Sequence, residues 1–293
     1  MVLKKNGVKP SEKIKIYTLV DNTAGYGFQG EWGLSFYIEA QGHKILFDTG
    51  MTSLASENAR LAKIDLSSID TLVLSHGHND HTGGLADFLK YTGDVPVISH
   101  PDIWTKKYVQ ENQNSLDYIG IPVCREELES RGAQFHLTTK TFEICQSIIT
   151  TGEVELNNPY EKIDGDLLVK TAGEFYCDPM MDDLSLIIQT DRGLVVITGC
   201  AHRGIVNTLQ HAQKITGDQR ILFAIGGFHL YQASQERLDW TVQTLLSMGI
   251  QKVSPCHCTG FHAMAQIYQN MPKQYQPIYA GLVIELETGL GNG

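Results

Sequence analysis

The sequence predicts an α/β protein built as a four-layer αββα sandwich, and two observations lead to this prediction. Short runs rich in β-branched and aromatic residues are followed by segments with helical periodicity, and this order occurs twice along the chain. Each half would place a sheet beside helices, so two halves packed sheet against sheet give four layers. A length of 293 residues suits one large domain, and we treat residues 1–293 as a single domain.

The first half begins with β-rich runs and continues into helices. Gly25 and Gly30 are among the turn residues that separate the early runs. Leu85, Phe88 and Leu89 share one helical face, which predicts an amphipathic helix after the fourth strand. The strands expected in this half are residues 14–20, 34–38, 44–47 and 69–74, and the helices are 53–63 and 84–91.

The middle of the chain, from about residue 101 to residue 140, differs from both halves. It is polar and its periodicity is poor. We therefore predict that this segment is an insertion within the single domain.

The second half repeats the order of strands and helices. Ile205, Leu209 and Ala212 stand at helical spacing, and Ser234 is placed to cap a long helix that stops at Gly249. The strands expected here are residues 142–150, 184–189, 193–198, 220–225 and 252–255, and the helices are 204–214 and 234–249.

The formal charge of −10 restricts the partners of the protein. Such an acidic chain is poorly suited to a nucleic-acid backbone, so no nucleic-acid partner is expected. A small anionic substrate remains compatible with this charge, because a bound metal ion reverses the local field. The oligomeric state is left open by the sequence.

Cysteine usage and the apolar runs bear on the compartment. The six cysteines are scattered along the chain, which is typical of reduced thiols and not of a disulfide scaffold. Residues 1–15 are polar and lysine-rich, without an apolar core of signal-peptide length. The apolar runs are too short to cross a bilayer. We therefore expect a cytoplasmic protein with no membrane partner.

The run His-Gly-His-Asn-Asp-His at residues 76–81 carries four metal-ligand side chains within six positions. His76 and His78 are two apart and point to the same side of an extended chain. Asp80 and His81 follow as the chain turns toward the next helix, so they face another direction. One loop can thus offer two ligands to each of two ions. The alternative, a histidine-rich surface loop, is disfavoured by the buried strand that precedes the run.

These ligand types define the expected cofactor. Neutral imidazole suits zinc, iron and manganese. The carboxylate of Asp80 adds a hard oxygen ligand to the second position. We expect a divalent metal, Zn²⁺ first, with one or two ions per chain and with iron or manganese as alternatives. In this scheme Asp80 is either a metal ligand or a catalytic general base.

Three further histidines follow predicted strands, where loops commonly carry function. We expect His202 and His257 to be metal ligands. His229 is placed to act in catalysis or to contact substrate. Asn22, in the turn before the first glycine-rich loop, is our other candidate for a substrate contact.

The sequence leaves more than one role possible for the carboxylate and thiol side chains near these positions. Asp48 ends an early strand and could receive the second ring N–H of a ligand histidine, although it could equally be a turn aspartate. Cys256 and Cys258 flank His257 and could bind zinc or undergo redox chemistry. For these two cysteines we favour packing beside a ligand.

With these motifs assembled, the sequence resembles the metallo-β-lactamase superfamily. The likeness rests on His-x-His-x-Asp-His at residues 76–81, on Asp-Thr-Gly at residues 48–50, and on the strand-end His257. The resemblance implies the αββα sandwich, with metal ions bound at one edge between the two sheets. It extends over nearly the whole chain except the middle segment.

A narrower resemblance concerns one subfamily, the proteins similar to 7,8-dihydropterin-6-methyl-4-(β-D-ribofuranosyl)aminobenzene-5′-phosphate synthase. The runs that carry it are residues 75–78, 80–84, 182–186, 198–202 and 226–230. The activity in that name joins a dihydropterin pyrophosphate to an aryl ribofuranosyl phosphate.

Two positions depart from the hydrolase pattern of the superfamily. Glu153 stands where a third-motif histidine is usual, and Cys200 stands where a bridging aspartate is usual. Losing a bridging carboxylate would weaken the hold on two metals at once, unless Cys200 or His202 substitutes for it. The resemblance therefore implies either one tightly bound metal or a modified pair.

Three functions fit these observations. The first is a metal-dependent enzyme that acts on a phosphorylated or pyrophosphorylated small molecule, such as a dihydropterin-type transferase. The second is a metal-dependent hydrolase of an ester, lactone, amide or phosphodiester. The third is a metal or ligand sensor without catalysis, which an open cluster of several ligand types at strand ends disfavours.

Overall fold

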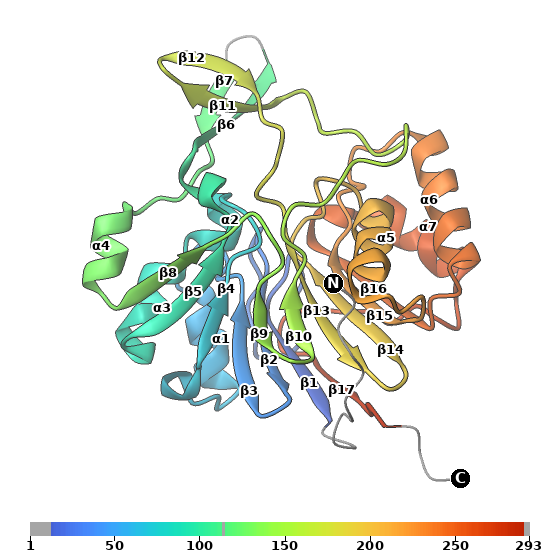
Figure 1. Ribbon diagram of the computed structural model, residues 1–293, viewed down its shortest axis with the longest axis horizontal. Helices are drawn as coiled ribbons and strands as arrows, with labels where there is room; N and C mark the ends of the chain where they lie inside the picture. The colour runs from blue at the N-terminus through green and yellow to red at the C-terminus, as the bar shows by residue number, and fades with distance from the viewer. Residues whose placement is uncertain (1–12, 113–114, 290–293) are drawn as a thin grey trace.

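The computed structural model describes residues 13–112 and 115–289 and confirms the four-layer αββα architecture (Figure 1). Two sheets face each other in the middle of the molecule, and helices cover the outer face of each. The first outer layer contains α1 (Leu54–Leu61), α3 (Leu85–Thr92) and α4 (Arg125–Ser130), and the second contains α5 (Ile205–Thr216), α6 (Gln235–Ser247) and α7 (Phe261–Asn270). Among the described residues, no helix is long and apolar enough to span a membrane.

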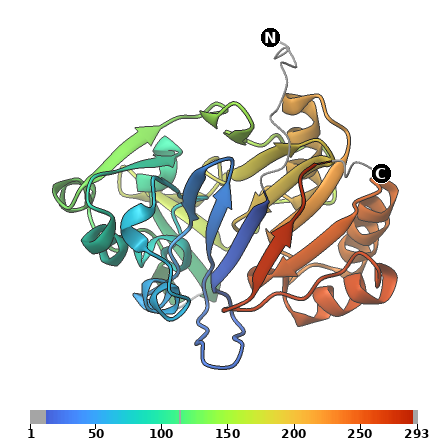
Figure 2. The ribbon, with the colours of Figure 1, turned by 90° about the horizontal axis from the view of Figure 1, so that it is seen from below.

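The first sheet has seven strands and mixes antiparallel with parallel pairing. Its order is β17 (Val283–Leu286), β1 (Ile14–Val20), β2 (Ser35–Ala40), β3 (His43–Phe47), β4 (Thr71–Val73), β5 (Val95–Ser99) and β8 (Ala133–Leu137). Strands β17, β1, β2 and β3 pair antiparallel, whereas β3, β4, β5 and β8 run parallel. The view from below in Figure 2 shows β17, in red, beside β1, in dark blue, so the two ends of the chain meet in one sheet.

The second sheet has six strands, in the order β16 (Lys252–Cys256), β15 (Ile221–Gly227), β14 (Gly193–Thr198), β13 (Ser185–Thr190), β10 (Ile148–Thr150) and β9 (Glu143–Cys145). Strands β14, β15 and β16 are parallel neighbours. The prediction of a single strand over residues 142–150 was wrong. The chain turns back between Cys145 and Ile148, and the two short strands pair antiparallel with a register shift.

A third sheet of four strands stands above the sandwich in Figure 1. It contains β6 (Lys106–Asn112), β7 (Ser115–Tyr118), β11 (Leu167–Thr171) and β12 (Glu174–Cys177). Residues 101–140, which we predicted as one insertion, therefore divide into two parts. Strands β6 and β7 leave the sandwich, but α4 and β8 return to it, and β8 becomes the edge strand beside β5. The short elements are α2 (Asn79–Thr82), η1 (Leu66–Ser68), η2 (Pro101–Trp104) and η3 (His257–Thr259).

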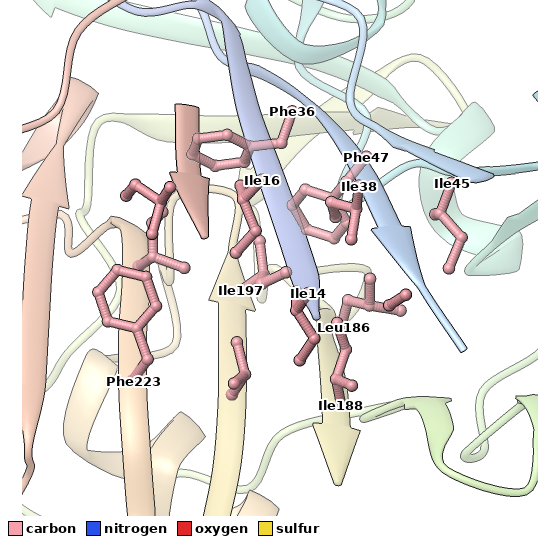
Figure 3. Close-up of a cluster of buried hydrophobic side chains, with 14 of the residues drawn as sticks. Ile14, Ile16, Phe36, Ile38, Ile45, Phe47, Leu186, Ile188, Ile197 and Phe223 are labelled. Atoms are coloured by element: carbon pink, nitrogen blue, oxygen red, sulfur yellow. The ribbon is translucent and has the colours of Figure 1, made fainter. Parts of the chain in front are cut away.

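The main core lies between the two large sheets (Figure 3). Alternate residues of the first sheet, such as Ile16 and Phe36, point toward Leu186, Ile197 and Phe223 of the second sheet. All five side chains are fully buried. Separate apolar clusters seal each sheet against its helices, which explains why both faces of both sheets are rich in Val, Ile, Leu and Phe.

The parallel strands position the functional loops. The carboxyl ends of β3 and β4 in one sheet and of β14, β15 and β16 in the other lie at the same edge of the sandwich. A direct hydrogen bond joins the two sheets there, because the Leu184 amide before β13 donates to the Ser75 carbonyl after β4 at 2.9 Å. Side chains that follow these strands are therefore brought together although they are far apart in sequence.

We expect Phe36→Ala to lower the free energy of unfolding by about 3–5 kcal/mol, because it leaves a cavity between the two sheets. Phe261→Ala is the matched control, since that side chain is 80% exposed at the start of α7 and should change stability by less than about 0.5 kcal/mol. Urea unfolding followed by circular dichroism measures both. Equal effects of the two substitutions would contradict the placement of Phe36 in the inter-sheet core.

Candidate metal centre

The edge of the sandwich gathers the metal-ligand side chains that the sequence singles out. Asp48 follows β3, and the run that begins at His76 follows β4. From the second sheet come Cys200 after β14, His229 after β15 and His257 after β16. The structure thus brings residues from five strand ends to one place, as expected for loops at the carboxyl ends of parallel strands.

The first group of candidate ligands consists of His76, His78 and His202. The ring centroids of His76 and His78 are 4.5 Å apart, and each lies 4.9 Å from the ring of His202. The Nε2 atom of His76 is 3.0 Å from Nδ1 of His78. The Nε2 atom of His78 and both ring nitrogens of His202 are buried and have no hydrogen-bond partner among the described residues. Buried nitrogens without partners are rare, and a metal ion would satisfy them.

The environment keeps this first group neutral. Burial lowers the pKa of His78 to about 3, and it lowers the pKa of His76 well below its usual range, helped by the adjacent imidazoles. Burial, and then the neighbouring His229, likewise depress the pKa of His202. A neutral imidazole offers a free lone pair, which is the form that binds a metal.

The second group consists of Asp80, His81, Cys200 and His257. The Nε2 atom of His81 lies 3.1 Å from Sγ of Cys200 and 3.3 Å from Nε2 of His257. A carboxylate oxygen of Asp80 is 3.2 Å from the same His257 nitrogen. Two nitrogens bound tetrahedrally to one zinc ion lie about 3.3 Å apart, so these residues fit a metal ion.

The charges in the second group differ from those in the first. Burial opposes a charged His81, but the carboxylates of Asp80 and Asp48 raise its pKa to about 9. Burial would also raise the pKa of Asp80, yet His81 and His257 hold it well below its usual range. Burial raises the pKa of the Cys200 thiol. Without a metal the group is therefore an Asp80–His81 ion pair beside a neutral thiol, and a cation would take the place of the histidine proton.

Cys200 connects the two groups. Its sulfur lies within 4.8 Å of a ligand nitrogen on both His76 and His202, and within the same distance of His81 and His257. The residue that stands in the position of the usual bridging aspartate is therefore within reach of both candidate ions.

Asp48 supports both groups through hydrogen bonds. One carboxylate oxygen is 2.7 Å from Nδ1 of His81 and accepts a hydrogen bond of 2.7 Å from the Ser75 hydroxyl. The other oxygen accepts from the Ser75 amide at 2.7 Å. The same hydroxyl is 2.8 Å from Nδ1 of His76. Of the two roles left open by the sequence, the geometry favours orientation of a ligand histidine.

The backbone at this point has no room for a larger residue after β14. A Cβ added to Gly199 would lie 2.1 Å from the Ser75 hydroxyl oxygen and 3.1 Å from Oδ2 of Asp48. Asp48 itself has a φ of 57°, a left-handed conformation that is uncommon for residues other than glycine. Strained backbone of this kind is concentrated at functional sites.

A buried ion-pair network holds the loop between His76 and His78. The Gly77 amide donates to the Asp182 carboxylate at 2.8 Å, and the Lys107 ammonium donates to Asp182 at 2.9 Å and to Asp178 at 2.7 Å. All three charged side chains are buried. Lys107 lies on β6, so the third sheet is tied to the metal-ligand loop. Our sequence reasoning missed these partners, although Asp182 lies in one of the runs that carry the subfamily resemblance.

Asn22 lies against a candidate ligand. Its side-chain oxygen is 3.0 Å from Nδ1 of His257, and its amide nitrogen donates to the His257 carbonyl at 3.3 Å. The Asp21 carboxylate accepts from the His257 amide at 2.9 Å. These contacts place Asn22 where it orients His257, whereas the sequence suggested a contact with substrate.

Glu153 lies apart from the two groups. Its carboxylate is 3.1 Å from Nε2 of His100, and among the described residues it belongs to no cluster of metal-ligand atoms. The third histidine beside His76 and His78 is instead His202, which comes from the loop after β14.

His229 borders the first group, with its ring centroid 4.1 Å from that of His202. Its Nε2 atom is 2.5 Å from a carboxylate oxygen of Asp164, and its Nδ1 atom is buried with no hydrogen-bond partner in residues 13–112 and 115–289. Burial would lower the pKa of His229, but Asp164 and then Cys258 raise it to about 10. Asp164 was not among the residues expected from sequence, because nothing in its surroundings marks it.

Residues 33–207 match the family model described as the metallo-beta-lactamase superfamily, which covers more than half of the chain. The chain belongs to the metallo-β-lactamase superfamily. Members of this superfamily typically bind divalent metals and are enzymes, which agrees with the two ligand groups described above.

Relatives of this superfamily member match it over nearly its full length. It is 34% identical to the 7,8-dihydropterin-6-methyl-4-(β-D-ribofuranosyl)-aminobenzene-5′-phosphate synthase of Methanocaldococcus jannaschii, covering 94% of this chain and 97% of the relative. A solved metal-dependent hydrolase of the β-lactamase superfamily, Tm1679, superposes with a TM-score of 0.80 at 31% identity, over 93% of this chain and 99% of that one. A diphosphatase from the PhnP family shares the fold, with a TM-score of 0.53, 14% identity and coverage of 95% and 99%.

We expect Asp48→Asn to weaken metal binding by about 10–100-fold, because the amide loses the charge that orients His81. Competition with a chromophoric chelator measures the dissociation constant. Asp65→Asn, on the exposed surface, is the matched control and should leave it unchanged. Unaltered affinity in Asp48→Asn would show that this carboxylate does not support a ligand.

The metal-free protein should lose stability as the pH falls from about 6.5 toward about 3. Over this window the unfolded chain protonates His78, whose folded-state pKa is about 3, so the unfolded state binds more protons than the folded state. His78→Gln should therefore reduce the slope of unfolding free energy against pH, whereas His262→Gln, an exposed histidine, is the control. Urea unfolding at several pH values tests this. A slope equal to that of the unaltered protein would contradict a neutral buried His78.

Proposed function

We propose that this protein is a metal-dependent enzyme that acts on a phosphorylated or pyrophosphorylated small molecule, and specifically a dihydropterin-type transferase. The observation that carries the proposal is the pair of ligand groups that converge on Cys200, in a chain 34% identical over 94% of its length to a relative named as a dihydropterin synthase. The reaction would join a dihydropterin pyrophosphate to an aryl ribofuranosyl phosphate, with release of pyrophosphate.

The residues fit two divalent ions. His76, His78 and His202 would hold one, and Asp80, His81 and His257 would hold the other, with Cys200 in reach of both. We propose Zn²⁺ first, with iron or manganese as alternatives. When bound, such ions neutralise anionic oxygens and polarise the bond to the leaving group. This also explains how a chain of charge −10 could accept an anionic substrate.

Asp80 is our candidate for the proton transfer. An aromatic carbon or nitrogen that attacks a dihydropterin pyrophosphate loses a proton after the new bond forms. The Asp80 carboxylate is held ionised by His81 and His257 and is the more open member of its group, with 12% of its side chain exposed against none for His81. It can therefore accept that proton if it is not fully engaged by a metal ion.

Two exposed aromatic side chains favour a substrate with flat rings. Trp32 is 49% exposed and Tyr231 is 64% exposed, and their ring centroids are 6.2 Å apart. The ring of Trp32 lies 5.2 Å from that of His257. Exposed aromatic faces beside a candidate metal ligand offer stacking surface to a pterin or aryl ring.

A hydrolase is the second candidate. The observation in its favour is the likeness to the solved metal-dependent hydrolase, at 31% identity and a TM-score of 0.80. In a hydrolase, water would replace the aryl acceptor at the same centre. The two functions therefore differ in the acceptor, which an assay can vary.

The deciding experiment follows the release of pyrophosphate from a dihydropterin pyrophosphate by the metal-loaded protein, with and without the aryl ribofuranosyl phosphate. The transferase predicts release that requires the acceptor, together with a joined product detected by mass spectrometry. Release without the acceptor would favour the hydrolase. Bound metal with no turnover would contradict an enzyme acting on this substrate and would favour a sensor.

The double substitution of His76 and His78 by alanine should remove one metal ion per chain and abolish this turnover, because two of the three nitrogens of the first group are lost. Metal content by inductively coupled plasma mass spectrometry checks the first expectation. His262→Ala, on the exposed surface of α7, is the control. Retention of the full metal content in the double variant would refute the ligand assignment.

A further inference from the structure

We propose that Cys200, His229 and Cys258 form a third, thiolate-rich metal-ligand group, suited to a soft or borderline cation such as Zn²⁺. This inference goes beyond the proposed function, because it adds a third ion that shares only Cys200 with the two groups described above, and it assumes no substrate. It also assigns His229 to metal binding, in place of the role in catalysis or the contact with substrate that the sequence suggested.

The three ligand atoms are close together and come from adjacent loops. A sulfur of each cysteine and a ring nitrogen of His229 all lie within 4.8 Å of one another. The loops follow β14, β15 and β16, which are parallel neighbours in the second sheet. Gly227 leaves space for the Cys258 thiol, because a Cβ there would lie 2.6 Å from its sulfur. Both cysteines are buried and free of disulfides.

His229 is oriented as metal-ligating histidines are. Its Nε2 atom is 2.5 Å from the Asp164 carboxylate, and Arg237 donates to its backbone carbonyl at 3.3 Å. With Nε2–H hydrogen-bonded to Asp164, the Nδ1 proton is the one that a metal ion would replace, and its loss would present the Nδ1 lone pair to the metal. That Nδ1 atom is buried and has no hydrogen-bond partner in the part of the chain that the structure describes. A cation between Nδ1 and the two sulfurs would supply the missing partner.

The backbone beside each ligand is strained. His229 has a φ of 45°, Ala201 next to Cys200 has 55°, and His257 next to Cys258 has 50°. For residues other than glycine such left-handed conformations are energetically unfavourable, and they are concentrated at functional sites. The strained residue on each of the three loops adjoins or is itself a ligand of this group.

The chemistry distinguishes this group from the other two. The first group is built on imidazoles and the second contains a carboxylate, whereas the third contains two sulfurs, which favour softer cations. Each thiol that becomes a ligand releases one proton to solvent as the metal binds. The Cys200 sulfur has more than one lone pair, so as a thiolate it can bridge this ion and the ion beside His81.

Cobalt is a suitable probe, because thiolate ligands give Co²⁺ an intense near-ultraviolet charge-transfer band. The full chain, freed of metal with a chelator, is titrated with Co²⁺. Cys258→Ser should lose about half of the band, as one of two thiolates is removed, and about one Co²⁺ per chain. Cys256→Ser removes a buried thiol outside the group, so this variant should retain the full band and the full Co²⁺ content. A full band and a full metal content in Cys258→Ser would overturn the proposal.

If Cys258→Ser does not fold, Asp164→Asn provides a second test. The Asp164 side chain is 33% exposed, and its substitution removes no ligand of the group. The substitution should weaken the sulfur-bound Co²⁺ by about 10–100-fold and leave the ion held by His76 and His78 unchanged. Unchanged affinity of the sulfur-bound ion would refute the role of His229. Both readouts report binding alone, so loss of the proposed transferase activity and failure of this inference can be told apart.

Discussion

One buried carboxylate holds together the loops on which the candidate metal centre depends. Asp48 accepts hydrogen bonds from the amide and the hydroxyl of Ser75 and lies against His81, and the same hydroxyl contacts His76. Functional side chains must be held within a few tenths of an ångström of their working positions. The two apolar sheets supply the stability that keeps Asp48 in its left-handed conformation at this point.

Several imidazole rings that Asp48 and its neighbours hold in place are buried, and their burial prepares them to bind metal. A buried ring nitrogen without a partner costs free energy, and within the described part of the chain His78 and His229 each have one and His202 has two. His78 and His202 are kept neutral, while His81 is held positive by the carboxylates of Asp80 and Asp48, and His229 by Asp164 and Cys258. Divalent cations would satisfy the free lone pairs and replace the protons, so folding prepares the site for metal at some expense in stability. Trp32 and Tyr231 stand exposed at its margin, where a flat ring could stack.

Most secondary structure was predictable because its pattern is local. The strands Ile14–Val20 and Gly193–Thr198 occur with the bounds expected, and Ser234 caps α6 by accepting from the Arg237 amide. The hairpin of β9 and β10 was missed because a continuous run of β-forming residues does not reveal a reversal. Strand β17 was missed because it exists through its pairing with β1 at the other end of the chain. The third sheet likewise pairs residues of β6 and β11 that are about sixty positions apart in the chain.

The sequence by itself determined the fold class and the chemistry of residues 76–81, because hydrophobic periodicity and closely spaced ligands act over a few residues. Only the tertiary structure decided which distant residues complete the site. It brought His202 to the first group, left Glu153 beside His100, and placed Asn22 against His257. It also joined Lys107 to Gly77 through Asp182. These contacts depend on how parallel strands pair and how two sheets pack, which are interactions between segments far apart in the chain.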